Sequence, residues 1–428
     1  MTARICLVTN TSVAHNPRLL KEADAFHAAG CAVRVVACQL FAEVARHDKE
    51  LMQRRGWRLE QLSLVREEPA GRRLYRRAWA RYQIYRRGLA RMGLGGGVAE
   101  RAHLIAYPEL LALACREPAD IFIAHSLRPL PIAAHAAAHH GAYLGFDAED
   151  YYPAELPERE RGAQVQHLNH YIENKYIRRC NYISAPSAQI ADALAERYGV
   201  RRPLVVHNVF PWSERERIDG RLHDRCGPAL SLYWFSQTIG LERGIQDAIR
   251  AAGQLEGPVQ IHLRGRISTA VRAELLELAR SCGVAERLRF HHLVAPEELV
   301  ARAAEHDVGL ATDIGVAHSL SNALTVTNKY FTYMLAGLAL AVSAQPGQSA
   351  ILAQCPGAGA LYPSGDYLAL AAILRHWQAD PAALRAARAA ALEAARVRWN
   401  WEHEQQCLLT HVAAVLETPR EARCNSWG

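Results

Sequence analysis

The sequence predicts an α/β protein built from two doubly wound parallel sheets. Short apolar runs alternate with longer helical stretches through both halves of the chain, which is typical of parallel sheets covered by helices on both faces. A polar break at 209–227 interrupts this alternation before it restarts. The length of 428 residues is also too large for one ordinary hydrophobic core, which favours two domains.

The first half of the chain opens with a strand, a helix and a second strand. Six apolar runs are expected to form strands: 5–8, 32–37, 121–124, 143–146, 182–185 and 204–206. Helical periodicity predicts helices at 17–29, which Gly30 closes, and at 130–140 and 188–198. These elements predict a parallel sheet in a first domain that spans residues 1–210.

The second half repeats the alternation after a predicted linker at 211–228. Strands are expected at 230–235, 260–264, 288–291, 308–311 and 339–343. Helices are expected at 244–254, 270–281, 296–305 and 328–335, followed by an Ala-rich helical region at 367–416. The pattern predicts a second parallel sheet, in a domain that spans residues 229–395.

A basic helix is predicted at residues 72–92 of the first domain. Between Arg72 and Arg91 the sequence has eight arginines and no acidic residue, interleaved at helical spacing with Leu, Tyr and Trp. Such a helix either lies on an anionic membrane surface or packs its aromatic side against the protein and leaves its arginines in water. No module typical of nucleic-acid binding accompanies it, so nucleic acid is not expected as a partner.

Composition excludes several classes of protein. Hydrophobic residues make up 50% and charged residues 22%, which is typical of a folded globular chain. Because no apolar run is long enough to cross a membrane and no secretion signal is found, we expect a cytoplasmic protein, with the basic helix available to the inner face of a membrane. The ten cysteines are scattered without metal-ligand spacing, so neither a metal nor a cofactor is expected.

The loop after the first strand lacks the glycines of two common nucleotide sites. Residues 9–18 contain no Gly-x-Gly-x-x-Gly, and the chain has no Gly-Lys-Ser/Thr motif of a P-loop. These absences argue against NAD binding and against a P-loop ATPase. Two Rossmann-like domains still predict a ligand at the carboxyl ends of the strands, where helix N-termini favour phosphate.

Several motifs resemble those of GT-B-fold glycosyltransferases of the retaining family 4. Residues 328–338 read Asn-Lys-Tyr-Phe-Thr-Tyr-Met-Leu-Ala-Gly-Leu and are similar to the family's Asn-Lys-Leu-Phe-Glu-Tyr-Met-Ala-Ala-Gly-Leu. Shorter family motifs are matched at 147–150, 206–209 and 359–366, and residues 399–402 resemble the Trp-Glu at the start of the family's last helix. The resemblance covers most of the chain.

The resemblance implies a GT-B architecture, with two Rossmann-like domains facing a cleft. A helix at 396–418 would cross back to the first domain, leaving a tail at 419–428. The implied activity is that of a hexosyltransferase-like enzyme that moves a sugar from a nucleotide-diphosphate sugar to a hydroxyl acceptor. It would act with retention and without metal in cell-surface glycan or glycolipid assembly, on a glycan or lipid-linked acceptor.

The sequence departs from the family at the donor site. The family's paired glutamates would fall at Leu324 and Thr332, and its first loop cation is absent from Ser236-Gln237, whereas the second survives as Arg243. A non-catalytic scaffold for a partner glycosyltransferase therefore stays open, as does a nucleotide-sugar isomerase. Titration with nucleotide sugars and product analysis with donor alone would separate these alternatives.

A site that takes a diphosphate without metal needs cations and backbone N–H donors. Arg243 and Lys329 would supply the cations, and the helix that begins near Thr327 and Asn328 would supply the N–H groups, although either of these two residues could simply cap that helix. The remaining candidate donor-binding residues are Ser236, Gln237, Gly244, Arg264, Thr325 and Thr332.

Carboxylates follow the predicted strand at 143–146. Asp147, Glu149 and Asp150 are candidate catalytic bases for an inverting reaction, or loop acids with no chemical role. In a retaining reaction the leaving phosphate oxygen would take the acceptor proton, and no protein base would be required. The candidate acceptor-binding residues are His15, Asn16, Arg18 and His125, and each histidine has a structural role as its alternative.

Overall fold

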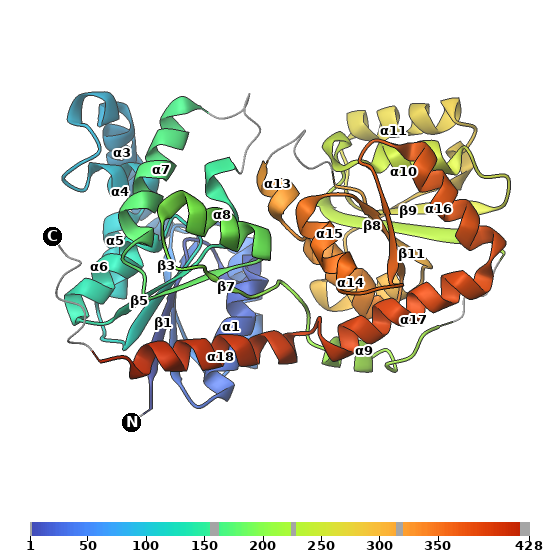
Figure 1. The fold of residues 1–428 in the computed structure, drawn as a ribbon. Helices are drawn as coiled ribbons and strands as arrows, with labels where there is room; N and C mark the ends of the chain where they lie inside the picture. The colour runs from blue at the N-terminus through green and yellow to red at the C-terminus, as the bar shows by residue number, and fades with distance from the viewer. Residues whose placement is uncertain (1, 155–161, 224–227, 314–319, 420–428) are drawn as a thin grey trace. The chain divides into compact units, whose positions relative to one another are not determined.

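The computed structural model describes residues 2–154, 162–223, 228–313 and 320–419. Within these ranges the chain divides into two compact units (Figure 1). The N-terminal unit contains the described residues up to 206 together with 405–419, and the C-terminal unit contains those at 207–404. None of the described helices is both long enough and apolar enough to span a membrane.

Seven parallel strands form the sheet of the N-terminal unit, in the order β3-β2-β1-β4-β5-β6-β7. Their bounds are β1 Arg4–Val8, β2 Ala32–Gln39, β3 Arg58–Ser63, β4 Ile121–His125, β5 Tyr143–Asp147, β6 Tyr182–Ala185 and β7 Leu204–Val205. Strands β4 and β5 are buried at every residue, as expected for a sheet covered on both faces. Because the strand order reverses between β1 and β4, their carboxyl ends mark the position where doubly wound sheets bind ligands.

Helices connect these strands and cover the sheet (Figure 1). They are α1 Pro17–Ala28, α2 Ala42–Met52, α3 Pro69–Met92, α4 Val98–His103, α5 Tyr107–Ala114, α6 Leu130–His140, α7 Ala163–Ile177, α8 Ala188–Tyr198 and α18 Trp401–Glu417, with short 3-10 turns η1 Val13–His15 and η2 Tyr152–Ala154. Asn16 caps α1 by accepting a hydrogen bond from the N–H of Leu19. This cap fixes the start of α1 beside the carboxyl end of β1.

Six parallel strands form the sheet of the C-terminal unit, in the order β10-β9-β8-β11-β12-β13. Their bounds are β8 Leu230–Thr238, β9 Val259–Arg266, β10 Leu288–His291, β11 Val308–Ala311, β12 Ala339–Ser343 and β13 Gly359–Tyr362. The strand order reverses between β8 and β11, and their carboxyl ends mark the corresponding ligand position of this unit.

Helices surround this second sheet as well. They are α9 Ser213–Glu216, α10 Ile245–Ala252, α11 Thr269–Ser281, α12 Leu299–Ala304, α13 Leu320–Leu324, α14 Asn328–Ala336, α15 Pro346–Ala353, α16 Tyr367–Ala379 and α17 Pro381–Val397, with 3-10 turns η4 Leu241–Arg243, η5 Ala285–Arg287 and η6 Pro296–Glu298. Helix α18 starts in this unit and belongs to the N-terminal unit from Gln405 onward.

The predicted fold class, α/β with two doubly wound parallel sheets, is confirmed. Strands β3 and β13 were absent from the prediction, because β3 alternates with polar residues (Arg-Leu-Glu-Gln-Leu-Ser) and β13 is a short run of four residues that starts with glycine (Gly-Ala-Leu-Tyr). The Ala-rich region splits into three helices, since Asp380 ends α16 and caps α17, and the chain bends again at 398–400. The predicted linker at 211–228 contains the short helix α9.

Candidate functional site

An aspartate at the carboxyl end of β5 forms a buried ion pair with α1. Arg18 donates from Nε to Asp147 Oδ2 (2.6 Å) and from Nη2 to Asp147 Oδ1 (2.7 Å), and Ser184 Oγ donates to the same Oδ1 (2.7 Å). The Asp147 side chain is completely buried. Because this bidentate pair occupies both carboxylate oxygens, Asp147 is held as a fixed negative charge between α1 and β5.

His125, the last residue of β4, lies among three carboxylates. Its Nδ1 is 3.2 Å from Asp147 Oδ2 and 3.3 Å from Glu149 Oε1, and its Nε2 is 3.5 Å from Glu22 Oε2. Burial of His125 disfavours the imidazolium form, but the carboxylates outweigh burial and raise the pKa of His125 to about 10. His125 therefore carries a positive charge in the folded protein at neutral pH.

Two carboxylates of this cluster differ sharply in proton affinity. Both oxygens of Glu22 are buried and accept no hydrogen bond from a described residue. Burial, together with repulsion from Asp147, raises the pKa of Glu22 to about 7. Burial would also raise the pKa of Asp147, but Arg18 and His125 hold it below its ordinary value. Near neutrality Glu22 exchanges a proton while Asp147 stays ionised.

Glu149 is the carboxylate of this cluster that reaches solvent. Its side chain is 26% exposed, its Oε1 accepts a hydrogen bond from Asn16 Nδ2 (2.6 Å), and His125 lies behind it. Asp150 accepts a bond from the neighbouring backbone N–H of Tyr151 (2.8 Å), as in a local turn.

Five of the predicted residues in this unit come together at one sheet edge, and they fall into two groups by exposure. Arg18, His125 and Asp147 are buried, and Arg18 and His125 both contact Asp147. Asn16 is buried as well, and it donates a hydrogen bond to Glu149, the partly exposed member of the group. His15 is exposed at the end of η1 and forms no ion pair or hydrogen bond with these five residues. Of the predicted acceptor-binding residues, only His15 is exposed, and among the five clustered residues only the catalytic candidate Glu149 reaches solvent.

Ser126, directly after β4, has a left-handed backbone with φ of 79°. Its N–H donates to the carbonyl of Asp147 (3.1 Å), and its Oγ donates to Asn10 Oδ1 (3.2 Å). A non-glycine residue in this conformation costs on the order of 1 kcal/mol or more, and such strain clusters at functional sites. Ser126 therefore marks the same edge of the sheet as the charged cluster.

Glu22, His125 and Asp147 approach one another closely enough to be tested as metal ligands. They do not fit a metal ion, because the Arg18 guanidinium already occupies both oxygens of Asp147 and lies 3.7 Å from Glu22 Oε1. A cation between these groups would lie against a buried guanidinium. The cluster is therefore a network of ion pairs and proton-binding groups.

In the C-terminal unit, Asp313 gathers side chains at the carboxyl end of β11. Lys329 Nζ lies 3.1 Å from Asp313 Oδ1, while Thr327 Oγ1 (3.3 Å) and Gln348 Nε2 (3.5 Å) donate to Oδ2. Both charged side chains are 6% exposed, and Lys329 Nζ lies 5.2 Å from the ring centre of Trp234. Lys329 is thus held in a neutral buried pair.

Thr327 occupies the N-cap position of α14 without capping it. Its side chain accepts no hydrogen bond from the helix, because it is turned toward Asp313. Asn328, the first residue of α14, is exposed. The first turn of α14 therefore lacks a side-chain cap, and its N–H groups carry the partial positive charge of a helix N-terminus.

Arg243 ends η4, after the carboxyl end of β8. Its carbonyl accepts a hydrogen bond from Thr312 Oγ1 (2.9 Å). Gly244 follows with φ of 69°, and a Cβ atom there would lie 1.9 Å from the Thr312 carbonyl oxygen, so only glycine fits. The Arg243 side chain is 37% exposed and 3.6 Å from Glu242 Oε1, and its Nε is buried without an acceptor among the described residues. Part of the Arg243 side chain thus reaches solvent, although its Nε does not.

Three further predicted donor-binding residues lie at the ends of β8 and β9. Arg264 is 7% exposed and donates to Tyr233 Oη (2.9 Å) and to the carbonyl of His292 (2.9 Å). Ser236 is half-buried and Gln237 is exposed at the end of β8. Only the latter two leave their side chains accessible to a ligand at this edge.

The remaining two predicted threonines bond to their own helical segments. Thr325 Oγ1 donates to the carbonyl of Ser321 (2.8 Å), and Thr332 Oγ1 donates to the carbonyl of Asn328 (3.1 Å) inside α14. Thr332 is completely buried. At position 332 the structure therefore presents no polar group to solvent.

Sequence reasoning missed Asp313, Gln348, Glu22 and Ser184. The signal for Asp313 was present, since it follows the apolar run 308–311 just as Asp147 follows 143–146. Glu22 and Ser184 gave no local signal, because their contacts arise only when α1, β4, β5 and β6 assemble. Their roles depend on strand order rather than on sequence spacing.

No protein-family model and no curated protein matches the chain. Solved structures match it at low identity. A structure of HepE from Anabaena in complex with UDP has a TM-score of 0.65 and 15% identity and covers 96% of this chain and 100% of its own. HepE with UDP-glucose gives 0.64 and 16%, with 96% and 99% coverage. The lipopolysaccharide outer core galactosyltransferase WaaB gives 0.58 and 12%, again with 96% and 99% coverage.

These likenesses establish the fold of the chain. Its two Rossmann-like parallel-sheet units correspond over nearly the full length to the two-domain GT-B architecture of nucleotide-sugar glycosyltransferases. The predicted GT-B fold class is therefore confirmed.

Proposed function

We propose that this chain is a glycosyltransferase that moves a sugar from a nucleotide-diphosphate sugar to a hydroxyl acceptor. The observation that carries the proposal is the full-length likeness to HepE structures that hold UDP and UDP-glucose. Retention of anomeric configuration, independence of metal and a role in cell-surface glycan or glycolipid assembly belong to the same proposal.

The donor is proposed to bind at the carboxyl edge of the C-terminal sheet. Arg243 contacts the diphosphate directly, because its side chain is 37% exposed beside the carboxyl end of β8. The uncapped first turn of α14 adds N–H groups. Lys329, paired with Asp313, positions this turn rather than meeting the ligand as a free charge. Ser236 and Gln237 complete the edge.

Nucleotide binding tests the donor site. We expect UDP to raise the midpoint of thermal unfolding, since a ligand of the folded state stabilises it by mass action. Arg243→Gln should weaken UDP binding by about tenfold or more, as expected for loss of a charge-assisted hydrogen bond. Arg250→Gln, the same charge change in the last turn of α10, serves as the matched control and should bind UDP like the native protein.

The absence of any affinity for UDP, GDP, ADP or their sugars would overturn the enzyme proposal and favour the non-catalytic scaffold. Consumption of the donor without an acceptor, with an altered nucleotide sugar as product, would favour an isomerase instead.

The acceptor is proposed to meet Glu149 at the carboxyl edge of the N-terminal sheet. Glu149 is exposed enough to accept a hydrogen bond from a sugar hydroxyl, while His125 and Asn16 hold its carboxylate in place. In a retaining reaction the acceptor proton passes to the leaving phosphate oxygen, so Glu149 binds the acceptor without acting as base.

Glu149→Gln tests this assignment because it keeps the shape and the hydrogen bond to Asn16. We expect a raised KM for acceptor and a kcat within about tenfold of the native value, with retention in the product seen by NMR. A loss of kcat by about 10²-fold or more together with inversion would make Glu149 a general base and overturn retention. Asp150→Ala is the matched control in the same loop, and activity should survive chelation of metals.

Helix α3 is proposed to contact an anionic membrane surface. Its inner side packs in the unit through buried Ala78 and Leu89. Its outer side carries exposed arginines, and Ile84, 66% exposed, lies on that side at helical spacing from Arg77 and Arg87. The buried inner side agrees with the packed alternative, and the exposed outer side is the part of α3 that is proposed to meet the membrane.

Vesicle binding tests the membrane proposal. The protein should sediment with vesicles rich in phosphatidylglycerol and not with pure phosphatidylcholine, and salt should release it. Replacing Arg77 and Arg87 with Gln should abolish most of the binding, whereas Arg280→Gln together with Arg302→Gln, on the C-terminal unit, should not. Equal loss in both double variants would assign the effect to net charge and overturn the role of α3.

A further inference from the structure

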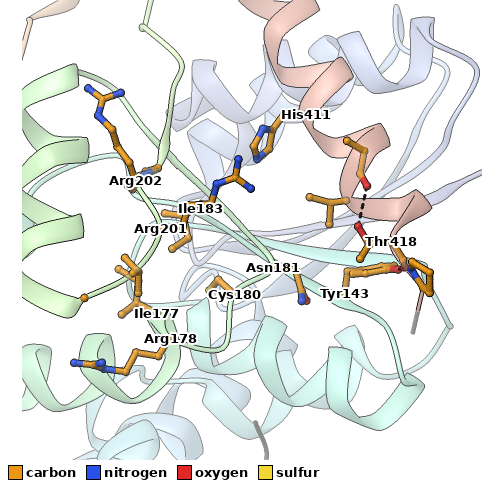
Figure 2. Close-up of a pocket in the computed structure, with 16 residues that line it drawn as sticks. Tyr143, Ile177, Arg178, Cys180, Asn181, Ile183, Arg201, Arg202, His411 and Thr418 are labelled. Atoms are coloured by element: carbon orange, nitrogen blue, oxygen red, sulfur yellow. Dashed lines mark hydrogen bonds between the residues drawn. The ribbon is translucent and has the colours of Figure 1, made fainter. Parts of the chain in front are cut away.

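A cavity of about 720 Å³ opens at the amino-terminal edge of the N-terminal sheet (Figure 2). The residues that begin β5 and β6 line it, together with the loops after α7 and α8 and the last turns of α18. Because β5 is five residues long, its carboxyl end at Asp147 lies about 13 Å from its start. The cavity is therefore separate from the charged cluster around Asp147.

The charged side chains that line this cavity are all basic. Arg178, Arg201, Arg202 and His411 line it, and none of the lining residues that the structure describes is Asp or Glu. Two of these arginines have partners: Arg202 Nε lies 2.5 Å from an oxygen of Asp192, and Arg178 donates to a side chain of α7.

Arg201 has no such partner. It is exposed and forms no ion pair or hydrogen bond with any residue in the described ranges. Figure 2 shows its guanidinium directed toward the imidazole of His411, whereas Arg202 extends to the opposite side. Burial and the charge of Arg201 lower the pKa of His411. Two groups that can both carry positive charge thus lie side by side without a counter-ion among the described residues.

The same cavity offers a third donor and an apolar wall. Asn181 Oδ1 accepts a hydrogen bond from the N–H of Leu144 (3.0 Å), which leaves the side-chain NH₂ group available. Ile183 and Val415 supply apolar surface. Tyr143 donates from its hydroxyl to the carbonyl of Thr418, which ties the end of α18 to the start of β5.

We propose that this cavity binds a small phosphate ester, with its phosphate between Arg201 and His411 and its organic part against Ile183 and Val415. The volume falls in the range of small-molecule sites and suits a sugar phosphate or a nucleotide. A phosphate ester would supply the missing negative charge to Arg201 and accept hydrogen bonds from His411 and Asn181. The site does not depend on the proposed donor site and would remain if that site were disproved.

Calorimetry with two probes, glucose 6-phosphate and AMP, tests the proposal and distinguishes its two sources of ligand. Whichever of the two probes binds, Arg201→Gln should weaken its binding by about tenfold or more. Arg202→Gln makes the same charge change at the next residue and should weaken it by less than about threefold, because Arg202 is already paired with Asp192. Both arginines are exposed, so both variants should keep the native unfolding midpoint.

Two results would overturn the proposal: neither probe binds at about millimolar concentration, or both variants weaken binding equally, which would indicate only general positive potential. Competition with UDP supplies a further check. Displacement of the probe by UDP in the native protein but not in Arg243→Gln would place the probe in the proposed donor site and overturn the proposal.

The role of His411 is tested with sulfate, whose charge does not change near neutrality. Because a bound anion favours the imidazolium, sulfate binding should tighten as the pH falls from about 8 to about 6. This dependence should be absent in His411→Gln. A flat pH profile in the native protein would remove His411 from the site.

Discussion

Each unit pairs a buried aspartate at the carboxyl edge of its sheet with a cation in the first turn of a helix, yet the two pairs lie on different strands and differ in what surrounds them. Asp147 ends β5 and is paired with Arg18, the second residue of α1. Asp313 follows β11 and is paired with Lys329, the second residue of α14. A cation in the first turn is repelled by the partial positive charge of the helix N-terminus. In both units the carboxylate of the aspartate offsets this repulsion.

The difference lies in the number of carboxylates. Asp313 is completed by the neutral donors Thr327 and Gln348. The Asp147 pair is surrounded by Glu22, Glu149 and the imidazolium of His125, and Glu22 exchanges a proton near neutrality. The carboxyl edge of a parallel sheet thus supports a neutral pair beside an uncapped helix in one unit and a proton-binding network beside a partly exposed glutamate in the other.

The largest effect is expected from Arg18→Met. The change keeps much of the side-chain bulk but leaves Asp147 buried without its bidentate partner and removes the guanidinium near Glu22. Breaking a buried ion pair at one partner costs about 3–5 kcal/mol of unfolding free energy. Urea denaturation at pH 7 measures this loss.

The control for Arg18→Met is Arg4→Met, which removes an exposed arginine paired with Asp120 in the same sheet. It should unfold at nearly the native urea concentration. Equal loss in both variants would mean that the buried position of the pair is irrelevant, and the comparison between the units would lose its basis.

A smaller effect is expected from Lys329→Met in the C-terminal unit. Asp313 loses its charged partner but keeps the hydrogen bonds from Thr327 and Gln348, so we expect a loss of about 2–3 kcal/mol, below that of Arg18→Met. Urea denaturation compares the two variants directly. A loss larger than that of Arg18→Met would show that the neutral donors contribute little.

The pH dependence of stability tests the proton exchange of Glu22 in the Asp147 cluster. The folded pKa of Glu22, about 7, exceeds its ordinary value of 4.5, so the folded state binds a proton that the unfolded state releases between these values. This contribution is complete below about 4.5 and is lost as the pH rises through about 7, at up to about 1.4 kcal/mol per pH unit.

Glu22→Gln should flatten this decline between about pH 5 and 7, as measured by urea denaturation at several pH values. Glu173, whose pKa burial also raises to about 7, provides a matched variant in the same unit. Glu173→Gln should remove a similar part of the decline in unfolding free energy with pH. The double variant should flatten the plot of unfolding free energy against pH further. If the slope of unfolding free energy against pH is unchanged in Glu22→Gln, the assignment of proton exchange to the Asp147 cluster is wrong.

The same contrast explains what the sequence could predict. Strands such as β11 and β12 were predicted to the residue because they are continuous apolar runs, buried on both faces. Asp147 was found because it directly follows such a run. The partners of Asp147 and Asp313 could not be read from spacing, since Arg18 is 129 residues from Asp147 and only the folded sheet brings them together.

The sequence also could not predict which of the candidate residues are exposed and which are buried. Arg18, His125, Lys329 and Thr332 were expected to meet ligands, and the structure buries all four. A charged residue next to a strand end has the same local pattern whether it faces a ligand or an internal partner. The number of opposite charges around the residue decides whether it faces a ligand or an internal partner. That number depends on strand order and not on the local sequence.

The smallest effect is expected from Thr327→Val, which tests how Asp313 is completed. The sequence offered two roles for Thr327, a cap for α14 or a ligand donor, and the structure gives it a third as a donor to Asp313. Because no helix cap is lost, the cost should be that of one hydrogen bond at 3.3 Å, about 1 kcal/mol, with the helix content unchanged by circular dichroism. Thr327→Ser should restore stability. If Thr327→Val instead cost as much as Lys329→Met, the neutral donors would hold Asp313 as firmly as the lysine does, and charge pairing would no longer be what the two units share.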